Sequence, residues 1–150
     1  MQYLAVILGI FGLEFGIKNY IETAKTEGKQ EKACKGALLI RKHHNRGIAL
    51  NVLQEKQGFV AAVSLILTLI ATMWFLITLG KSGKGLLKWG LALLLGGAYS
   101  NTYDRLARRY VVDYVSFNVP FRWLRRIIFN IGDFCIMAGA IMSALGYCRQ

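Results

Sequence analysis

The sequence predicts an all-α integral membrane protein with four transmembrane helices in a single domain. Of its 150 residues, 55% are hydrophobic, and the mean hydropathy is +0.39. This profile is typical of a membrane protein rather than a soluble domain. A helix needs about 20 mostly apolar residues to cross a bilayer, and four such spans use roughly half of a chain of this length. We therefore expect residues 1–150 to form one membrane domain.

The charge balance limits the class of partner. Lys and Arg outnumber Asp and Glu by 19 to 8, for a net charge of +11. In a membrane protein this excess favours anionic phospholipid headgroups as a partner. Nucleic acid is not expected, because the charge lies in loops between apolar segments. No metal site is expected either, because His43 and His44 are adjacent, a poor spacing for binding one ion.

Residues 1–21 form the first predicted span, which we expect the protein to retain. The span contains Glu14 and Lys18, which lie four residues apart and so on one helix face. Two interpretations stay open for this pair. It either marks the membrane edge, with Lys18 extending to the interface, or has a functional role. Close packing of this helix is favoured by three glycines at about one-turn spacing: Gly9, Gly12 and Gly16.

A polar loop follows over residues 22–58. Its residues 23–35 could form a short surface helix or a tethered turn. Residues 37–52 alternate loosely between apolar and polar, with Asn45-Arg46-Gly47 in the middle. An Asn-x-Gly sequence between apolar runs predicts a turn that joins two short strands.

The second and third spans are predicted at residues 59–79, which carry no charge, and at residues 86–103. Asn101 and Asp104 end the third span on one helix side, and Arg105 follows. Small residues near the same end should let another backbone or a substrate approach closely: Gly90, Gly96, Gly97, Ala98 and Ser100.

A second polar loop over residues 105–126 precedes the fourth span at residues 127–147. The loop contains a β-branched stretch at residues 111–115 that is expected to be extended. Asp133 lies seven residues past Arg126, or about 10 Å along a helix. A carboxylate at that depth must be protonated, paired or facing a wet cavity.

Chain order places many polar residues on one side of the membrane, because the third span ends on the same membrane side as the fourth span begins. The gathered residues are Glu14, Asn45, Asn101, Asp104, Arg105, Asp113, Asn130 and Asp133. Two carboxylates that converge there could share a proton and activate water, as in aspartic proteases. The residues alone do not choose between Asp104 and Asp113 as a member of the pair.

The spacing of these residues resembles the lipoprotein signal peptidases, the signal peptidase II family, over all four spans. The family pattern has Asp-Gln-x-x-Lys in the first span, Asn-x-Gly-x-Ala in the next loop, then GGxxGNxxDR, Val-Val-Asp-Phe and Phe-Asn-x-Ala-Asp. The corresponding segments here are residues 14–18 (EFGIK), 45–49 (NRGIA), 96–105 (GGAYSNTYDR), 111–114 (VVDY) and 129–133 (FNIGD).

The resemblance implies an intramembrane aspartyl endopeptidase that removes signal peptides from diacylglyceryl-modified prolipoproteins, without a metal or organic cofactor. It implies that Asp113 and Asp133 are the catalytic pair. Asp104 would be a structural partner of Arg105 or of backbone donors. Substrate-holding and orienting roles fall to Asn45, Asn101, Arg105 and Asn130. The loop after the first span would form a small extracytoplasmic β-cradle.

The resemblance also implies a bacterial cytoplasmic membrane protein with an outward-facing active site and both termini inside; we expect a monomer. The two long polar loops hold fourteen Lys and Arg residues, and the positive-inside rule would place them in the cytoplasm. We follow the resemblance, because its motifs are more specific than a charge count. The chain departs from the pattern at four positions: Glu14, Phe15, Ser100 and Gly132.

Two other function classes remain as alternatives. A small transporter or proton-linked channel would also carry Asp and Asn within its spans. A non-catalytic lipid-binding membrane protein could keep the same fold. A transporter would not need two aspartates within mutual reach on one side, and a non-catalytic protein should tolerate Asp113→Asn.

Overall fold

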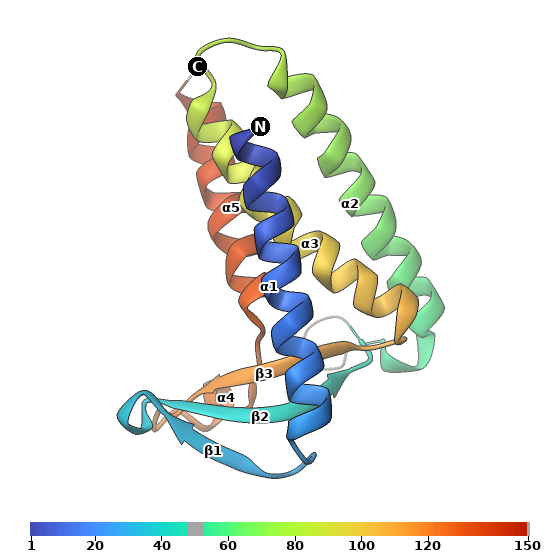
Figure 1. The fold of residues 1–150 in the computed structure, drawn as a ribbon, viewed down its shortest axis with the longest axis vertical. Coiled ribbons are helices and arrows are strands. Elements are labelled where there is room, and N and C mark those ends of the chain that lie inside the picture. Colours follow the sequence, from blue (N-terminus) through green and yellow to red (C-terminus); the bar gives the residue numbers. More distant parts are fainter. Residues whose placement is uncertain (48–52, 150) are drawn as a thin grey trace.

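The structure is a computed structural model that describes residues 1–47 and 53–149. Four long helices stand above a small sheet, and both chain ends lie at the end of the bundle away from that sheet (Figure 1). The elements in chain order are α1 (Gln2–Ala24), β1 (Gln30–Ala33), the 3-10 turn η1 (Cys34–Gly36), β2 (Leu38–Asn45), the 3-10 turn η3 (Gln54–Lys56), α2 (Gln57–Leu79), α3 (Gly85–Ala107), β3 (Val111–Phe117), α4 (Arg122–Arg126) and α5 (Ile131–Cys148).

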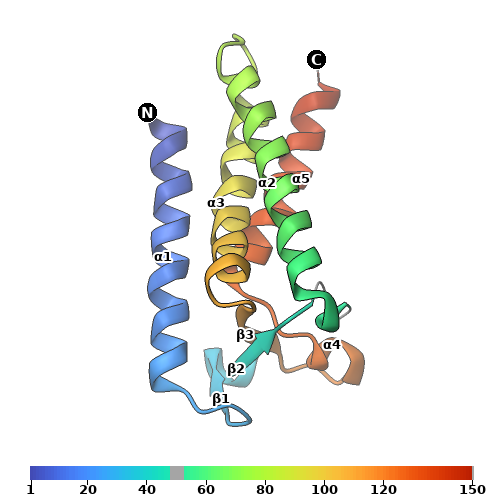
Figure 2. The same ribbon diagram turned by 90° about the vertical axis from the view of Figure 1, so that its right-hand side faces the viewer.

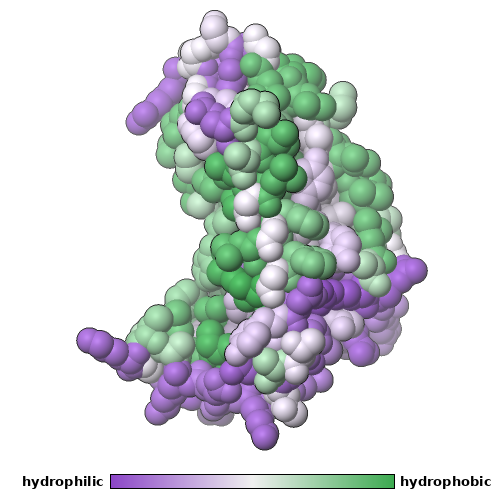
Figure 3. Space-filling view, viewed as in Figure 1, coloured by the Kyte–Doolittle hydropathy of each residue, from purple (hydrophilic) through white to green (hydrophobic). Residues whose placement is uncertain are grey.

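Within the described ranges, three helical segments are long and apolar enough to cross a membrane: α1, Gln54–Leu79 and α5. The prediction of a mainly helical membrane protein is thus confirmed, while the count of four spans is matched only in part. The remaining long helix, α3, has 23 residues but includes Lys88, Asp104 and Arg105. On the face shown in Figure 3, apolar residues cover much of the helices, and hydrophilic ones gather around the sheet and at the opposite end.

The central helix is α3, which packs against α1, α2 and α5. Leu91 and Leu95 of α3 form an apolar core with Ile7 of α1 and Phe75 of α2. Against α5 the contact is backbone to backbone: a Cβ on Gly97 would lie 2.2 Å from the Gly132 carbonyl oxygen. The predicted close approach at small residues of the third span is therefore confirmed. The same prediction for Gly9, Gly12 and Gly16 is wrong, because a Cβ at any of them would meet nothing within 4 Å.

The sheet is antiparallel with strand order β1-β2-β3 and lies under the helices (Figure 2). In the edge strand β3, Val112 and Tyr114 pack against Ile21 of α1. The prediction of an extended segment at residues 111–115 is confirmed by β3. Residues 30–33 form a strand rather than a surface helix. The second strand expected after the Asn45 turn falls on residues 48–52, outside the described ranges.

Two helix boundaries differ from the prediction, and both differences position the polar residues. α3 continues to Ala107, so Asp104 and Arg105 belong to its last turn instead of following it. α5 begins at Ile131 rather than at residue 127. The cause is Phe129, whose backbone N–H donates to the Val115 carbonyl at 2.7 Å. This pairing with β3 holds the backbone at Phe129 in an extended conformation, so α5 begins only after it.

Candidate active site

Asp113 lies on β3 with 2% of its surface exposed and accepts two side-chain amide donors. Asn45 Nδ2 donates to Oδ2 at 3.0 Å, and Asn130 Nδ2 donates to Oδ1 at 2.7 Å. The strand register explains the first contact. Asn45 lies opposite Val111, and a residue two positions further along a strand projects from the same face. The Asn45 orientation is itself fixed, because its Oδ1 accepts the Gly47 N–H at 3.1 Å.

Asp133 is the third residue of α5 and forms a reciprocal capping box with Asn130. Asn130 Oδ1 accepts the Asp133 N–H at 2.9 Å, and Asp133 Oδ2 accepts the Asn130 N–H at 3.0 Å. Asp133 Oδ1 accepts Asn101 Nδ2 at 2.8 Å. The expectation that Asp133 lies about 10 Å along its helix is therefore wrong. It belongs to the first turn of α5, where the helix N-terminus favours a negative charge.

Asn130 connects the two carboxylates, since it contacts Asp113 with its side chain and Asp133 with its backbone and side chain. It is completely buried. Burial, reinforced by the charge of Asp133, raises the pKa of Asp113 to about 7. Two nearby carboxyl groups in a low-dielectric site do not easily both ionise. The arrangement can therefore hold one proton between two acids near neutral pH.

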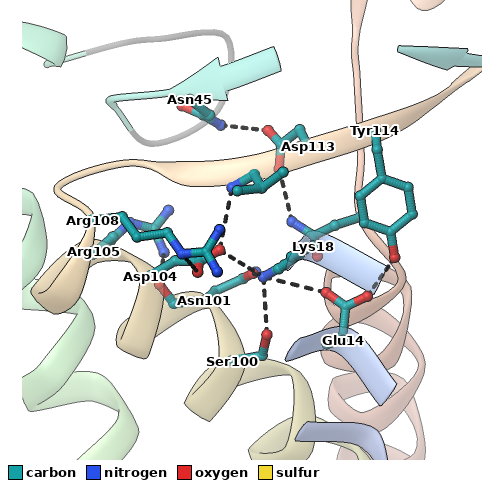
Figure 4. A network of polar contacts seen from close by, with 12 residues as sticks. Glu14, Lys18, Asn45, Ser100, Asn101, Asp104, Arg105, Arg108, Asp113 and Tyr114 are labelled. Atoms are coloured by element: carbon teal, nitrogen blue, oxygen red, sulfur yellow. Dashed lines mark hydrogen bonds and ion pairs between the residues drawn. The ribbon is translucent and has the colours of Figure 1, made fainter. Parts of the chain in front are cut away.

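Lys18 is buried and joins α1 to α3 (Figure 4). Its Nζ lies 3.3 Å from Glu14 Oε2 and 3.0 Å from Asp104 Oδ2, and donates to Ser100 and Asn101 at 2.9 Å. Lys18 is only 1% exposed and does not extend to an interface. The membrane-edge interpretation of the Glu14–Lys18 pair is therefore wrong. Through Asn101, whose side chain also contacts Asp133, Lys18 is one residue removed from the carboxylate pair.

Asp104 holds the end of α3 to its surroundings. Besides Lys18, its carboxylate contacts Arg108 Nε at 3.2 Å and accepts the Val112 N–H at 3.2 Å. The expected backbone donor is therefore present, but the cationic partners are Lys18 and Arg108 rather than Arg105. Because Val112 precedes Asp113 on β3, the contact also helps to place that strand.

Arg105 points to another part of the site. Its guanidinium donates to Ser64 Oγ and to the Asn101 carbonyl, both at 3.4 Å. Arg105 and Asn101 line a cleft of about 200 Å³ between α2, α3 and α5. The other lining residues are mostly apolar: Ser64, Leu67, Thr68, Leu94, Ala98 and Ile136. A mostly apolar chain with polar groups at one end would suit this cleft.

Glu14 completes the network by contacting β3. The Tyr114 hydroxyl donates to Glu14 Oε1 at 2.5 Å (Figure 4). The same hydroxyl accepts the Ile131 N–H at 3.2 Å. The sequence analysis included Tyr114 only as part of a pattern, and assigned no role to Arg108. A signal was present for Arg108, which lies four residues after Asp104 on a helix. None was present for the bond of Tyr114, whose partner is 100 residues away.

The chain matches known proteins over nearly its whole length. A family model described as signal peptidase (SPase) II matches residues 6–149. The lipoprotein signal peptidase of Brucella ovis is 32% identical over 151 aligned residues, covering 97% of this chain and 90% of that protein. That of Clostridium tetani is 29% identical over 142 residues, covering 95% and 88%.

Solved structures share the fold. A bacterial membrane enzyme solved at 2.3 Å superposes with a TM-score of 0.82 at 23% identity, covering 99% of this chain and 88% of that one. A second, solved at 1.9 Å, has a TM-score of 0.77 at 24% identity, covering 97% and 92%. From the family match over residues 6–149 and the identity to curated relatives, the chain belongs to the signal peptidase II family.

Proposed function

We propose that this membrane protease cleaves lipid-modified prolipoproteins with Asp113 and Asp133 as its catalytic pair. Membership of the signal peptidase II family favours a protease over a transporter or a non-catalytic lipid-binding protein. The observation that carries the residue assignment is the bridge through buried Asn130, which contacts both carboxylates. Asp104 is excluded from the pair because its carboxylate is occupied by Lys18, Arg108 and a backbone N–H.

The two aspartates have different surroundings, and these assign different roles. Asp133 lies at a helix N-terminus and accepts the Asn101 amide and the Asn130 N–H, and these donors stabilise its ionised form. Asp113 has a pKa raised to about 7 and holds the proton. In the reaction, Asp133 takes a proton from the attacking water, while the Asp113 proton polarises the scissile carbonyl. The roles then reverse as the amine leaves.

Four further polar residues support the pair. Asn45 and Asn130 orient Asp113, and Asn101 orients Asp133. Arg105 lines the cleft between α2, α3 and α5 and is the residue proposed to hold the substrate backbone. An extended, apolar signal peptide entering this cleft from the lipid would bring its cleavage site to Asp113 and Asp133.

The proposal extends to the arrangement of the protein in the membrane. α3 is proposed as the fourth span, since its charged end is enclosed and Asp104 is paired. The active site then lies at one membrane face, which we assign to the outside of a bacterial cytoplasmic membrane. There, exposed Phe121 and Trp123 of the α4 segment would enter the interface. The adjacent arginines would contact anionic headgroups of the outer leaflet: Arg122, Arg125 and Arg126. The single domain is proposed to act as a monomer.

The test is cleavage of a synthetic peptide that carries a diacylglyceryl-cysteine, by purified protein in detergent. Wild-type protein should cut before the modified cysteine, and the same peptide without the lipid should be cut at least tenfold more slowly. Asp113→Asn and Asp133→Asn should each abolish cutting, with unchanged elution on size exclusion. Glu31→Gln serves as the control, because Glu31 is 62% exposed and pairs with Lys25 far from the site. Wild-type turnover by either aspartate variant would refute the assignment of the pair.

A further inference from the structure

The buried carboxylate of Glu14 reaches from α1 to the first turn of α5. Its Oε1 accepts the Tyr114 hydroxyl at 2.5 Å, and that hydroxyl accepts the backbone N–H of Ile131 at 3.2 Å. Glu14 is 0% exposed and Tyr114 3% exposed. Among the residues that the structure describes, neither Glu14 nor Tyr114 hydrogen-bonds directly to Asp113 or Asp133 through its side chain. However, Tyr114 follows Asp113 directly, and Ile131 follows Asn130. The contact therefore joins the two segments that carry the carboxylate pair.

The direction of these hydrogen bonds is determined by their partners. A backbone N–H can only donate, so the Tyr114 oxygen must accept from Ile131. Its single proton is then free to point to Glu14, whose carboxylate is paired with Lys18 at 3.3 Å. Ile131 is the first residue of α5, and the N–H groups of a first helical turn lack partners inside their own helix. The Tyr114 hydroxyl thus supplies an acceptor that the start of α5 would otherwise lack.

Gly132 makes room for this arrangement. A Cβ at position 132 would lie 3.2 Å from Glu14 Oε2 and 2.9 Å from Asn130 Oδ1. The Glu14 carboxylate thus occupies part of the space that a side chain at position 132 would need. The Glu14 side chain is long enough to reach the Tyr114 hydroxyl, and the absence of a side chain at Gly132 leaves space for the Glu14 carboxylate.

We infer that Glu14, Tyr114 and Gly132 act as one set of positioning residues, which holds the start of α5 against β3 and so sets the geometry of the carboxylate pair. This inference rests on the proposed function. The capping box fixes Asn130 and Asp133 relative to α5, while the Tyr114 hydroxyl fixes α5 relative to β3. A misplacement of about 1 Å between reacting groups can lower a rate roughly 100-fold.

The experiment measures kcat and KM for the lipopeptide in four variants. Glu14→Asp, Tyr114→Phe and Gly132→Ala should each lower kcat about 10- to 100-fold, with KM changed less than threefold. The double variant Glu14→Asp/Tyr114→Phe should be no slower than the slower of its two single variants, because both changes break the same hydrogen bond. Tyr110→Phe is the matched control, because Tyr110 stacks on His44 outside this network, and it should retain wild-type kcat.

The pH profile separates positioning from mere stability. If α5 moves away from β3, the Asp133 charge acts less strongly on Asp113, so the alkaline limb of the single variants should shift to lower pH. A double variant impaired by the product of its two single effects would overturn the inference, as would single variants with wild-type kcat. If Gly132→Ala does not fold, the Glu14→Asp and Tyr114→Phe single variants and their double variant decide. A wild type that cuts no lipopeptide would instead refute the proposed function.

Discussion

Asn130 donates its side-chain amide to Asp113 Oδ1 at 2.7 Å, and it cannot turn this amide around. Its own Oδ1 is held by the Asp133 N–H at 2.9 Å. The orientation of the Asn130 amide is therefore fixed by the first turn of α5. One residue thus couples the capping of a helix to the placement of a carboxyl group on a strand.

The first prediction concerns Asn130. Asn130→Ala should lower kcat about 100-fold, because it removes the donor to Asp113 and displaces Asp133. The lost N-cap should also destabilise the protein by about 1 kcal/mol. Both effects are measured with the lipopeptide assay and thermal unfolding in detergent. Asn118→Ala is the control: Asn118 also donates its amide, to the Gly36 carbonyl at 2.7 Å, but far from the carboxylates. Similar activity losses in the two variants would contradict the special role of Asn130.

The second prediction concerns pH. Burial and the Asp133 charge raise the pKa of Asp113 to about 7, so Asp113 is protonated below that pH and ionised above it. Because the proposed mechanism needs one protonated and one ionised carboxyl group, kcat should fall on the alkaline side with a midpoint near that value. It should also fall in acid, when Asp133 is protonated. A rate that stays flat from acid to alkaline pH would exclude the shared-proton mechanism.

The third prediction separates Asp104 from the catalytic pair. Asp104→Asn removes one of two carboxylates from buried Lys18 and one partner from Arg108, so the free energy of unfolding should fall by about 3 kcal/mol. Activity of the folded fraction should fall less than tenfold. The measurements are thermal unfolding in detergent and turnover per folded molecule. A stable but inactive Asp104→Asn protein would mean that Asp104 takes part in the chemistry.

The fourth prediction concerns orientation, where the charge rule and the family assignment disagree. In a variant without native cysteines, Arg122→Cys should be labelled in intact cells by an impermeant thiol reagent. Ser82→Cys should react only after permeabilisation. Both positions are exposed, whereas Ser116, in the same polar segment as Arg122, is fully buried and unsuitable as a reporter. The reverse labelling pattern would place the site in the cytoplasm, against the proposed function.

The sequence by itself determined the class of the protein and predicted the members of the site. Apolar segments of spanning length indicate helices, and ionisable residues within or beside them are costly enough to indicate a role. The resemblance of the motifs around Asp113 and Asp133 to the signal peptidase II pattern implied this pair, whereas the residues alone did not choose between Asp104 and Asp113. These signals are local, because composition and short spacing carry them.

Only the tertiary structure decided how the site residues are held. α5 begins at Ile131 rather than at residue 127 because Phe129 pairs with Val115, a contact that no local preference reveals. Lys18 pairs with Asp104 rather than extending to an interface. Glu14 and Tyr114, 100 residues apart, meet because α1 packs against β3. A buried polar group is costly unless it has a hydrogen-bond partner, and that partner can be distant in the sequence. The sequence shows which polar groups are present, but only the tertiary structure shows how they are paired.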